Sequence, residues 1–148
     1  MNTAKVLFKF TNDSCITEDG YSNTPLLCAA NGHLEVVRVL LEGGTNIERG
    51  NIFQNTPLHT AAWFGHVEVC RLLLDRGARV NSLNAWKGTP LHSAAEKGYL
   101  LVVKLLEEWG ADVKLKNEKG QTASDKARSK GKKDVADWLD SLTMVNVR

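Results

Sequence analysis

Short blocks of apolar residues with helical spacing alternate along the chain with polar, glycine-containing stretches. In one block Leu58, Ala61 and Ala62 lie three and four positions apart, and a second block follows from Val67 to Leu74. Apolar residues at this spacing form one face of an amphipathic helix. The pattern therefore predicts pairs of short helices, a first helix with a small-residue face and a second helix with larger aliphatic residues.

A seven-residue motif marks the start of the first helix in each pair. It reads TPLLCAA from Thr24, TPLHTAA from Thr56 and TPLHSAA from Thr89. A degenerate copy, TASDKAR, begins at Thr122. The glycines that separate the two helices recur every 33 residues, at Gly32, Gly65, Gly98 and Gly131. A threonine followed by proline favours a helix start, because threonine caps the helix and proline fits its first turn. The chain is thus predicted to be a tandem array.

This unit resembles the ankyrin repeat, whose signature is a 33-residue T-P-L-H-x-A repeat. The resemblance extends from about Asp19 to Leu142. It implies an all-α solenoid of stacked helix-turn-helix units joined by short β-hairpin or turn connections. It also implies that the hairpins and first helices line a concave face, whose variable residues select a protein partner.

We expect a single domain over residues 1–148. Its predicted parts are a partial N-terminal unit (1–23), three repeats (24–55, 56–88, 89–121), a degenerate C-terminal capping repeat (122–142) and a tail (143–148). The first repeat lacks one residue between its helices, so its first helix is expected to be shorter. Residues 1–10 are compatible with either a leftover second helix or a strand.

The last unit has the features of a capping repeat with one solvent-exposed face. Val135, Trp138, Leu139 and Leu142 retain an apolar stripe, whereas Asp134, Asp137 and Asp140 are expected to point away from it; these seven residues define the two faces of the final helix. A polar outer face is typical of terminal repeats.

Composition says little about function but indicates the cellular compartment in which the protein acts. The 148 residues carry a net charge of +2, and the basic excess is confined to residues 111–148, which hold nine basic and six acidic residues. This balance gives no reason to expect specific nucleic-acid binding. Three cysteines without CxxC spacing favour a reducing compartment, so we expect a cytoplasmic or nuclear monomer, with no secretory leader and no membrane span.

Aromatic residues are the strongest candidates for partner binding. Tyr21, Phe53 and Trp86 fall in consecutive hairpins, and Trp63 and Phe64 end a first helix. Exposed aromatic residues are common anchors of protein interfaces; the alternative is that some of them stiffen the stack. Polar residues on the same face are predicted to form a rim, or else to be solvated surface: Arg49, Asn51, Asn55, Asn84, Lys87, Glu96 and Lys97.

The histidines are interpreted as structural. His59 and His92 occupy the fourth letter of the motif, where the family resemblance implies a hydrogen bond between helix and hairpin. Their separation lacks the close ligand spacing of zinc sites, and no catalytic or nucleotide-binding motif occurs in the chain. We therefore expect a non-enzymatic scaffold or adaptor with no metal and no cofactor. The alternative is that the chain recruits substrates for a larger multidomain enzyme.

The sequence offers two further candidate sites, a basic patch and an asparagine. A basic patch in the last unit, which would attract an acidic protein, anionic lipid or nucleic acid, or would simply keep the terminal helix soluble, comprises Lys126, Arg128, Lys130, Lys132 and Lys133. Asn81 occupies the place where some ankyrin domains are hydroxylated, so the resemblance makes it a candidate modification site.

Overall fold

The computed structural model describes Leu26 and residues 30–145. Several predictions fall on residues outside this range: the choice of helix or strand for residues 1–10, the place of Tyr21, and most of the first helix of the repeat at 24–55.

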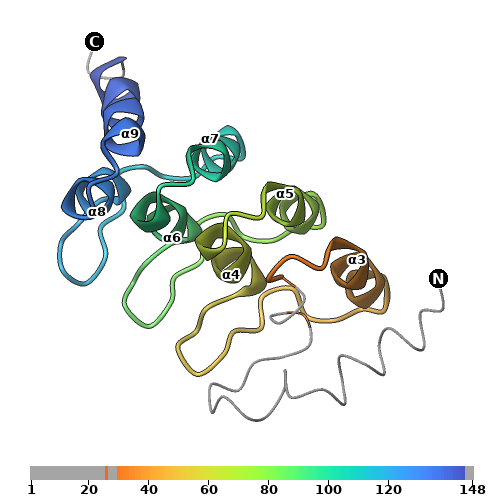
Figure 1. Ribbon diagram of the computed structural model, residues 1–148. Coiled ribbons are helices and arrows are strands. Elements are labelled where there is room, and N and C mark those ends of the chain that lie inside the picture. Colours follow the sequence, from red (N-terminus) through yellow and green to blue (C-terminus); the bar gives the residue numbers. More distant parts are fainter. Residues whose placement is uncertain (1–25, 27–29, 146–148) are drawn as a thin grey trace.

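Seven helices in the described residues form two rows (Figure 1). The outer row contains α3 (Leu34–Glu42), α5 (Val67–Asp75), α7 (Leu100–Glu108) and α9 (Lys133–Val145); the inner row contains α4 (Pro57–Trp63), α6 (Pro90–Lys97) and α8 (Ala123–Ser129). Helices of one row contact the next helix of that row, and each inner helix packs on the outer helix that follows it in the chain. The predicted all-α solenoid is confirmed.

The connections between units are turns. No strand occurs in residues 30–145, so the segments expected as β-hairpins project without forming sheet. We call residues 51–55, 84–88 and 117–121 the projecting loops. Each is closed at its base by one backbone bond, for example from Asn51 N to Asn55 O (3.2 Å) and from Asn84 N to Gly88 O (2.9 Å).

The repeated threonine starts each inner helix as predicted. Thr56 Oγ1 accepts a bond from His59 N (3.3 Å), and Thr56 N donates to His59 Nδ1 (3.2 Å). Thr89 and Thr122 form the same reciprocal cap with His92 and Asp125. These bonds satisfy amide groups that a helix leaves open at its start.

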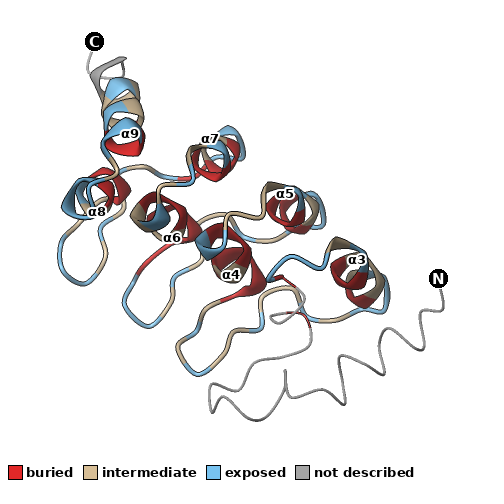
Figure 2. Ribbon diagram, in the orientation of Figure 1, coloured by how far each residue is buried: buried red, intermediate tan, exposed pale blue. Residues whose placement is uncertain are grey.

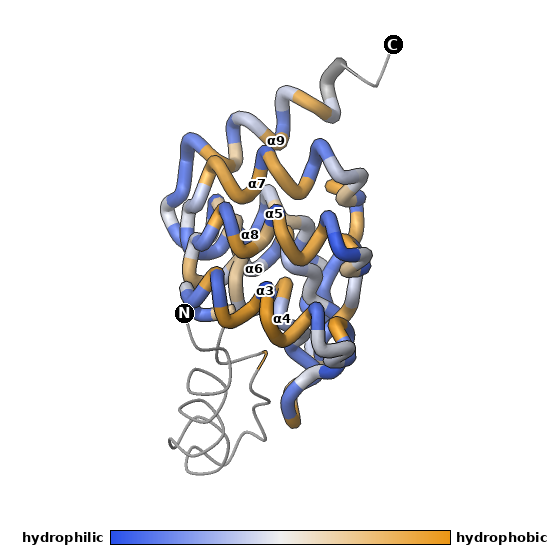
Figure 3. Tube along the Cα trace, turned by 90° about the vertical axis from the view of Figure 1, so that its right-hand side faces the viewer, coloured by the Kyte–Doolittle hydropathy of each residue, from blue (hydrophilic) through white to orange (hydrophobic). Residues whose placement is uncertain are grey.

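The core runs as a strip between the two rows (Figure 2). Ala61 and Ala62 are fully buried, as are the larger Leu73 and Cys70 on α5. The small residues let successive inner helices approach closely. Hydropathy along the trace shows the same division, with apolar segments on the stacked outer helices and polar connections between them (Figure 3). Burial raises the pKa of the Cys70 thiol to about 12, so this cysteine acts as a packing residue.

Three of the four turn glycines, Gly32, Gly65 and Gly98, are covered by a side chain from the following unit. The ring of Tyr99 lies over Gly65, so close that a Cβ on this glycine would stand 2.8 Å from the ring. The side chain of Lys132 covers Gly98 in the same way. Both glycines have positive φ, so glycine is required here for backbone conformation and for space.

The projecting loops are bonded to one another. Ala85 N donates to Phe53 O (2.9 Å), and one unit later Glu118 N donates to Trp86 O (2.9 Å). Because these bonds repeat with the period of the chain, the loops lie side by side and present one continuous surface.

The C-terminal cap has the predicted apolar stripe, with one correction. Val135 and Leu139 are buried, and Asp134 and Asp137 are exposed. Asp140, however, faces α8: it accepts a bond from Ser124 Oγ (2.6 Å) and is paired with Arg128. The pattern of charges alone did not reveal that a buried serine on α8 offers Asp140 a partner.

Candidate protein-binding groove

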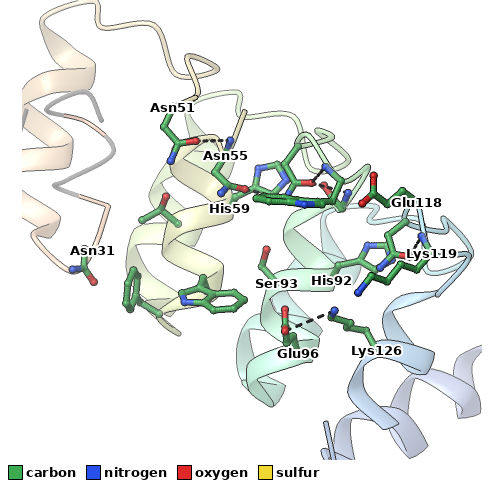
Figure 4. Close-up of a pocket in the computed structure, with 17 residues that line it drawn as sticks. Asn31, Asn51, Asn55, His59, His92, Ser93, Glu96, Glu118, Lys119 and Lys126 are labelled. Atoms are coloured by element: carbon green, nitrogen blue, oxygen red, sulfur yellow. Dashed lines mark hydrogen bonds and ion pairs between the residues drawn. The ribbon is translucent and has the colours of Figure 1, made fainter. Parts of the chain in front are cut away.

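A groove of about 710 Å³ runs along the inner row of helices. Its walls are the projecting loops on one side and the exposed faces of α4, α6 and α8 on the other (Figure 4). Asn51 and Asn55 lie at one end, Ser93 and Glu96 in the middle on α6, and Lys119 and Lys126 at the other end. The groove therefore spans three successive units.

Trp86 forms the central aromatic surface. Its side chain lines the groove and is 45% exposed. The ring of Phe53 from the preceding loop stacks beneath it, with centroids 5.3 Å apart and planes at 26°. Phe53 itself does not line the groove. Of this pair, Trp86 has the free face, whereas Phe53 supports it.

Trp63 and Phe64 provide a second aromatic surface at the end of α4. They line the groove and are 37% and 45% exposed. Lys97 Nζ lies 4.8 Å from the centroid of the Trp63 ring, at cation–π distance. Three of the five aromatic candidates thus lie in one groove, and Tyr21 is outside the described residues.

The predicted asparagines line the groove but are engaged in holding its walls. Asn84 Oδ1 accepts bonds from Trp86 N (3.0 Å) and Gly88 N (2.9 Å), and its Nδ2 donates to Asn55 Oδ1 (2.9 Å). Asn51 Oδ1 accepts from Phe53 N (2.9 Å) and Asn55 N (3.2 Å). These side chains shape the loops that carry the aromatic rings.

Three of the predicted rim residues lie outside the groove lining: Lys97, which lies over Trp63, and two loop residues. Arg49 and Lys87 are exposed on the loops, and neither lines the groove. Lys87 has a φ of 58° at the loop tip, which turns the chain back toward the next inner helix.

Glu96 links the groove to the basic patch. Its Oε1 lies 3.8 Å from Lys126 Nζ and 3.7 Å from Lys130 Nζ. Arg128 is paired with Asp140, Lys132 packs over Gly98, and Lys133 is exposed at the start of α9. The five cations therefore divide: Lys126 lines the groove, Lys130 adjoins it through Glu96, and the other three lie elsewhere.

The sequence analysis missed several polar residues of the groove: Thr60, Ser93, Asn117, Glu118 and Lys119. The period was sufficient to find four of them, because Thr60, Ser93, Asn117 and Lys119 each lie 33 residues from another groove residue, whereas Glu118 aligns with Ala85, which does not line the groove. Lys119, for example, occupies in the third loop the place of Phe53 and Trp86 in the first two.

The two motif histidines are neutral structural bridges. His59 Nε2 donates to Gly88 O (2.9 Å) and His92 Nε2 to Gln121 O (2.9 Å), which confirms the expected helix-to-loop bond. Burial lowers the pKa of His59 to about 4 and lowers that of His92 as well. In the described part of the chain, no three histidine, cysteine or acidic residues cluster as metal ligands would.

Asn81 is half-buried between two units. Its Oδ1 accepts a bond from Asp112 N (2.9 Å), just as Glu48 Oε2 accepts from Arg79 N (2.8 Å) one unit earlier. An enzyme that modifies Asn81 would have to displace this contact.

Comparison with protein-family models agrees with the geometry. The model for ankyrin repeats in three copies matches residues 1–84 and 44–117. The chain belongs to the ankyrin repeat family. Ankyrin repeat domains mediate protein–protein interactions in general, and they are typically non-catalytic. A search of curated proteins finds no match to this ankyrin repeat chain. None of its described helices has both the length and the apolar character to cross a membrane.

Proposed function

We propose that this protein is a non-enzymatic scaffold or adaptor that binds a protein partner in the groove of its inner face. The observation that carries the proposal is the gathering of three partly exposed aromatic side chains, Trp63, Phe64 and Trp86, along one preformed groove. The proposal treats residues 1–148 as one repeat domain acting in a reducing compartment.

The binding mechanism follows from rigidity. Trp86 is supported by the Phe53 ring and by the bond from its own amide to Asn84 Oδ1. Because ring and loop are ordered before the partner arrives, binding loses little conformational entropy. Large rigid aromatic side chains then bury much area, and the polar residues around them set the orientation of the partner.

The alternative basic surface has weaker support. Three of its five cations are already paired with carboxylates, namely Lys126, Lys130 and Arg128. Only Lys132 and Lys133 are outside these ion pairs, and the stem of Lys132 packs against the turn at Gly98. A cationic surface for lipid or nucleic acid would need a broader set of unpaired charges.

The test compares two tryptophan variants in partner capture. Trp63→Ala with Trp86→Ala should abolish capture of specific partners while the thermal midpoint falls by only a few degrees, because both rings are partly exposed. Trp109→Ala is the matched control, since Trp109 is 44% exposed but lies outside the groove lining. Equal capture by the groove variant and the control would contradict the proposal.

A further inference from the structure

The groove changes its chemical character from one end to the other. Columns of residues related by the repeat period show the change: Phe53, Trp86 and Lys119 form one column, and Phe64, Lys97 and Lys130 form another. A third column reads Thr60, Ser93 and Lys126. In all three columns a neutral residue in the unit of α4 becomes a lysine in the unit of α8.

The charges at the second end are incompletely balanced. Glu96 and Glu118 are the acidic groove residues, whereas Lys119 and Lys126 line the groove and Lys130 adjoins it through Glu96. Glu96 serves both Lys126 and Lys130. Among the described residues Lys119 is in no ion pair, and its side chain is exposed. This end therefore has an excess of positive charge.

At the opposite end the lining residues carry no formal charge, and the nearby Lys97 ammonium lies over the Trp63 ring. Its lining from the first loop and α4 consists of Asn51, Asn55, Thr60, Trp63, Phe64 and the buried His59, which is neutral because burial lowers its pKa to about 4. An occupant that satisfies both ends must be apolar at one end and anionic at the other.

We infer that the groove binds an extended peptide segment with an apolar anchor against Trp63 and Trp86 and acidic side chains against Lys119 and Lys126. The inference rests on the proposed function and specifies the partner's chemistry. Packed helices lie about 8–10 Å apart, and an extended chain advances about 3.3 Å per residue. The acidic residues are thus expected about three and about six positions from the anchor.

The first experiment selects ligands without assuming a partner. A displayed library of random peptides of about twelve residues, long enough to span three units when extended, is selected on the intact protein. We expect enriched sequences to combine an aromatic or large aliphatic residue with acidic residues on one side of it. Enrichment of uncharged or basic sequences, or no enrichment above a surface without protein, overturns the inference.

The second experiment places a selected peptide in the groove. Its dissociation constant is measured by fluorescence anisotropy for Lys119→Glu and for the matched control Lys114→Glu, which makes the same charge change at an exposed residue outside the groove lining. We expect about fivefold to tenfold weaker binding for K119E and less than about twofold change for K114E. Equal effects of the two variants overturn the inference.

Glu96 supplies the opposite prediction. Glu96→Gln removes the carboxylate shared by Lys126 and Lys130 and should tighten binding of the acidic peptide by about twofold to fivefold. Unchanged or weaker binding contradicts the inference. If peptides are selected but bind the Trp63 and Trp86 double variant as well as the wild type, the proposed function itself fails; if they require the tryptophans but carry no acidic residues, only the inference fails.

Discussion

His59 joins two units of the stack, because its Nε2 donates to the carbonyl of Gly88 at 2.9 Å. The same ring accepts a bond from Thr56 N through Nδ1. Both bonds require the neutral imidazole, with a hydrogen on Nε2 and a lone pair on Nδ1. The start of α4 and the base of the next projecting loop therefore depend on one uncharged side chain.

The first prediction is a loss of stability in mild acid. Burial lowers the pKa of His59 from its ordinary value of 6.5 to about 4 in the folded protein, so the unfolded chain binds a proton first as the pH falls. The stabilisation is complete above about pH 6.5 and is lost progressively toward pH 4. The loss in free energy of unfolding should approach about 3 kcal/mol, and His92, whose pKa is also lowered by burial, adds to it.

Urea unfolding at a series of pH values measures this loss. His59→Gln should be less stable at neutral pH and should show a flatter dependence of stability on pH between 6.5 and 4. A variant with the wild-type slope would show that another group controls the acid response.

The second prediction concerns the covered turn glycines. Gly65→Ala should lower the free energy of unfolding by about 2–4 kcal/mol, because it combines positive φ with a Cβ only 2.8 Å from the Tyr99 ring. Gly77→Ala is the control: its φ is also positive, at 97°, but nothing lies within 4 Å of the added Cβ. It should lose only about 1–2 kcal/mol.

A double variant separates the two causes. Tyr99→Ala in the Gly65→Ala background should recover part of the lost stability, because it removes the ring that the new Cβ meets. Denaturant unfolding of the four proteins in this cycle gives the coupling energy. Strictly additive effects would mean that the ring moves aside freely.

The third prediction concerns the capping helix. Ser124 is buried and donates to Asp140 (2.6 Å), and this bond is the main cause that lowers the pKa of Asp140. Ser124→Ala should lower the free energy of unfolding by about 1–2 kcal/mol. The stabilisation from the Asp140 carboxylate should fade as the pH falls below about 3.8, because a lowered pKa means that the charged form is the one the fold favours.

Thermal unfolding followed by circular dichroism tests this change. Ser129→Ala is a suitable control, since the Ser129 hydroxyl is exposed and bonds only its own helix at Lys126 O. If the two serine variants have the same midpoint, the contact between α8 and α9 does not depend on Ser124.

The sequence predicted the elements of this fold because each unit carries its own start and stop signals. Thr56 and Pro57 begin α4, and Gly65, which has a positive φ, lies in the turn that follows this helix. All three residues fall within ten positions, so local sequence signals were sufficient to predict the helix. Equivalent residues of a repeat also stack on one another, which is why the sequence alone assigns Trp63, Phe64 and Trp86 to one face.

Contacts that depend on the distance between units were harder to predict. The sequence placed Phe53 and Trp86 in the same column, but not that the second ring lies on the first and leaves only one of them available to a partner. Glu96 was assigned to the rim, yet its two lysine partners come from the next unit at i+30 and i+34. Ion pairs at such spacings cannot be predicted from the local sequence, because they depend on how far one unit is rotated relative to the next.

The last prediction links loop structure to binding. Asn84 holds Trp86 through a bond to its amide and holds the preceding loop through Asn55. Asn84→Ala should lower stability by about 1–3 kcal/mol and should weaken binding of groove ligands by about fivefold or more, because Trp86 loses the support that orders it before contact. Ligand affinity is compared with that of Asn84→Asp, which retains the Oδ1 acceptor for Trp86 N, loses the donor to Asn55 and adds a negative charge beside Asn55 Oδ1. If the aspartate variant binds like wild type while the alanine variant does not, the bond to the Trp86 amide is the one that prepares the groove; equal losses in both would assign the effect to the contact between the loops.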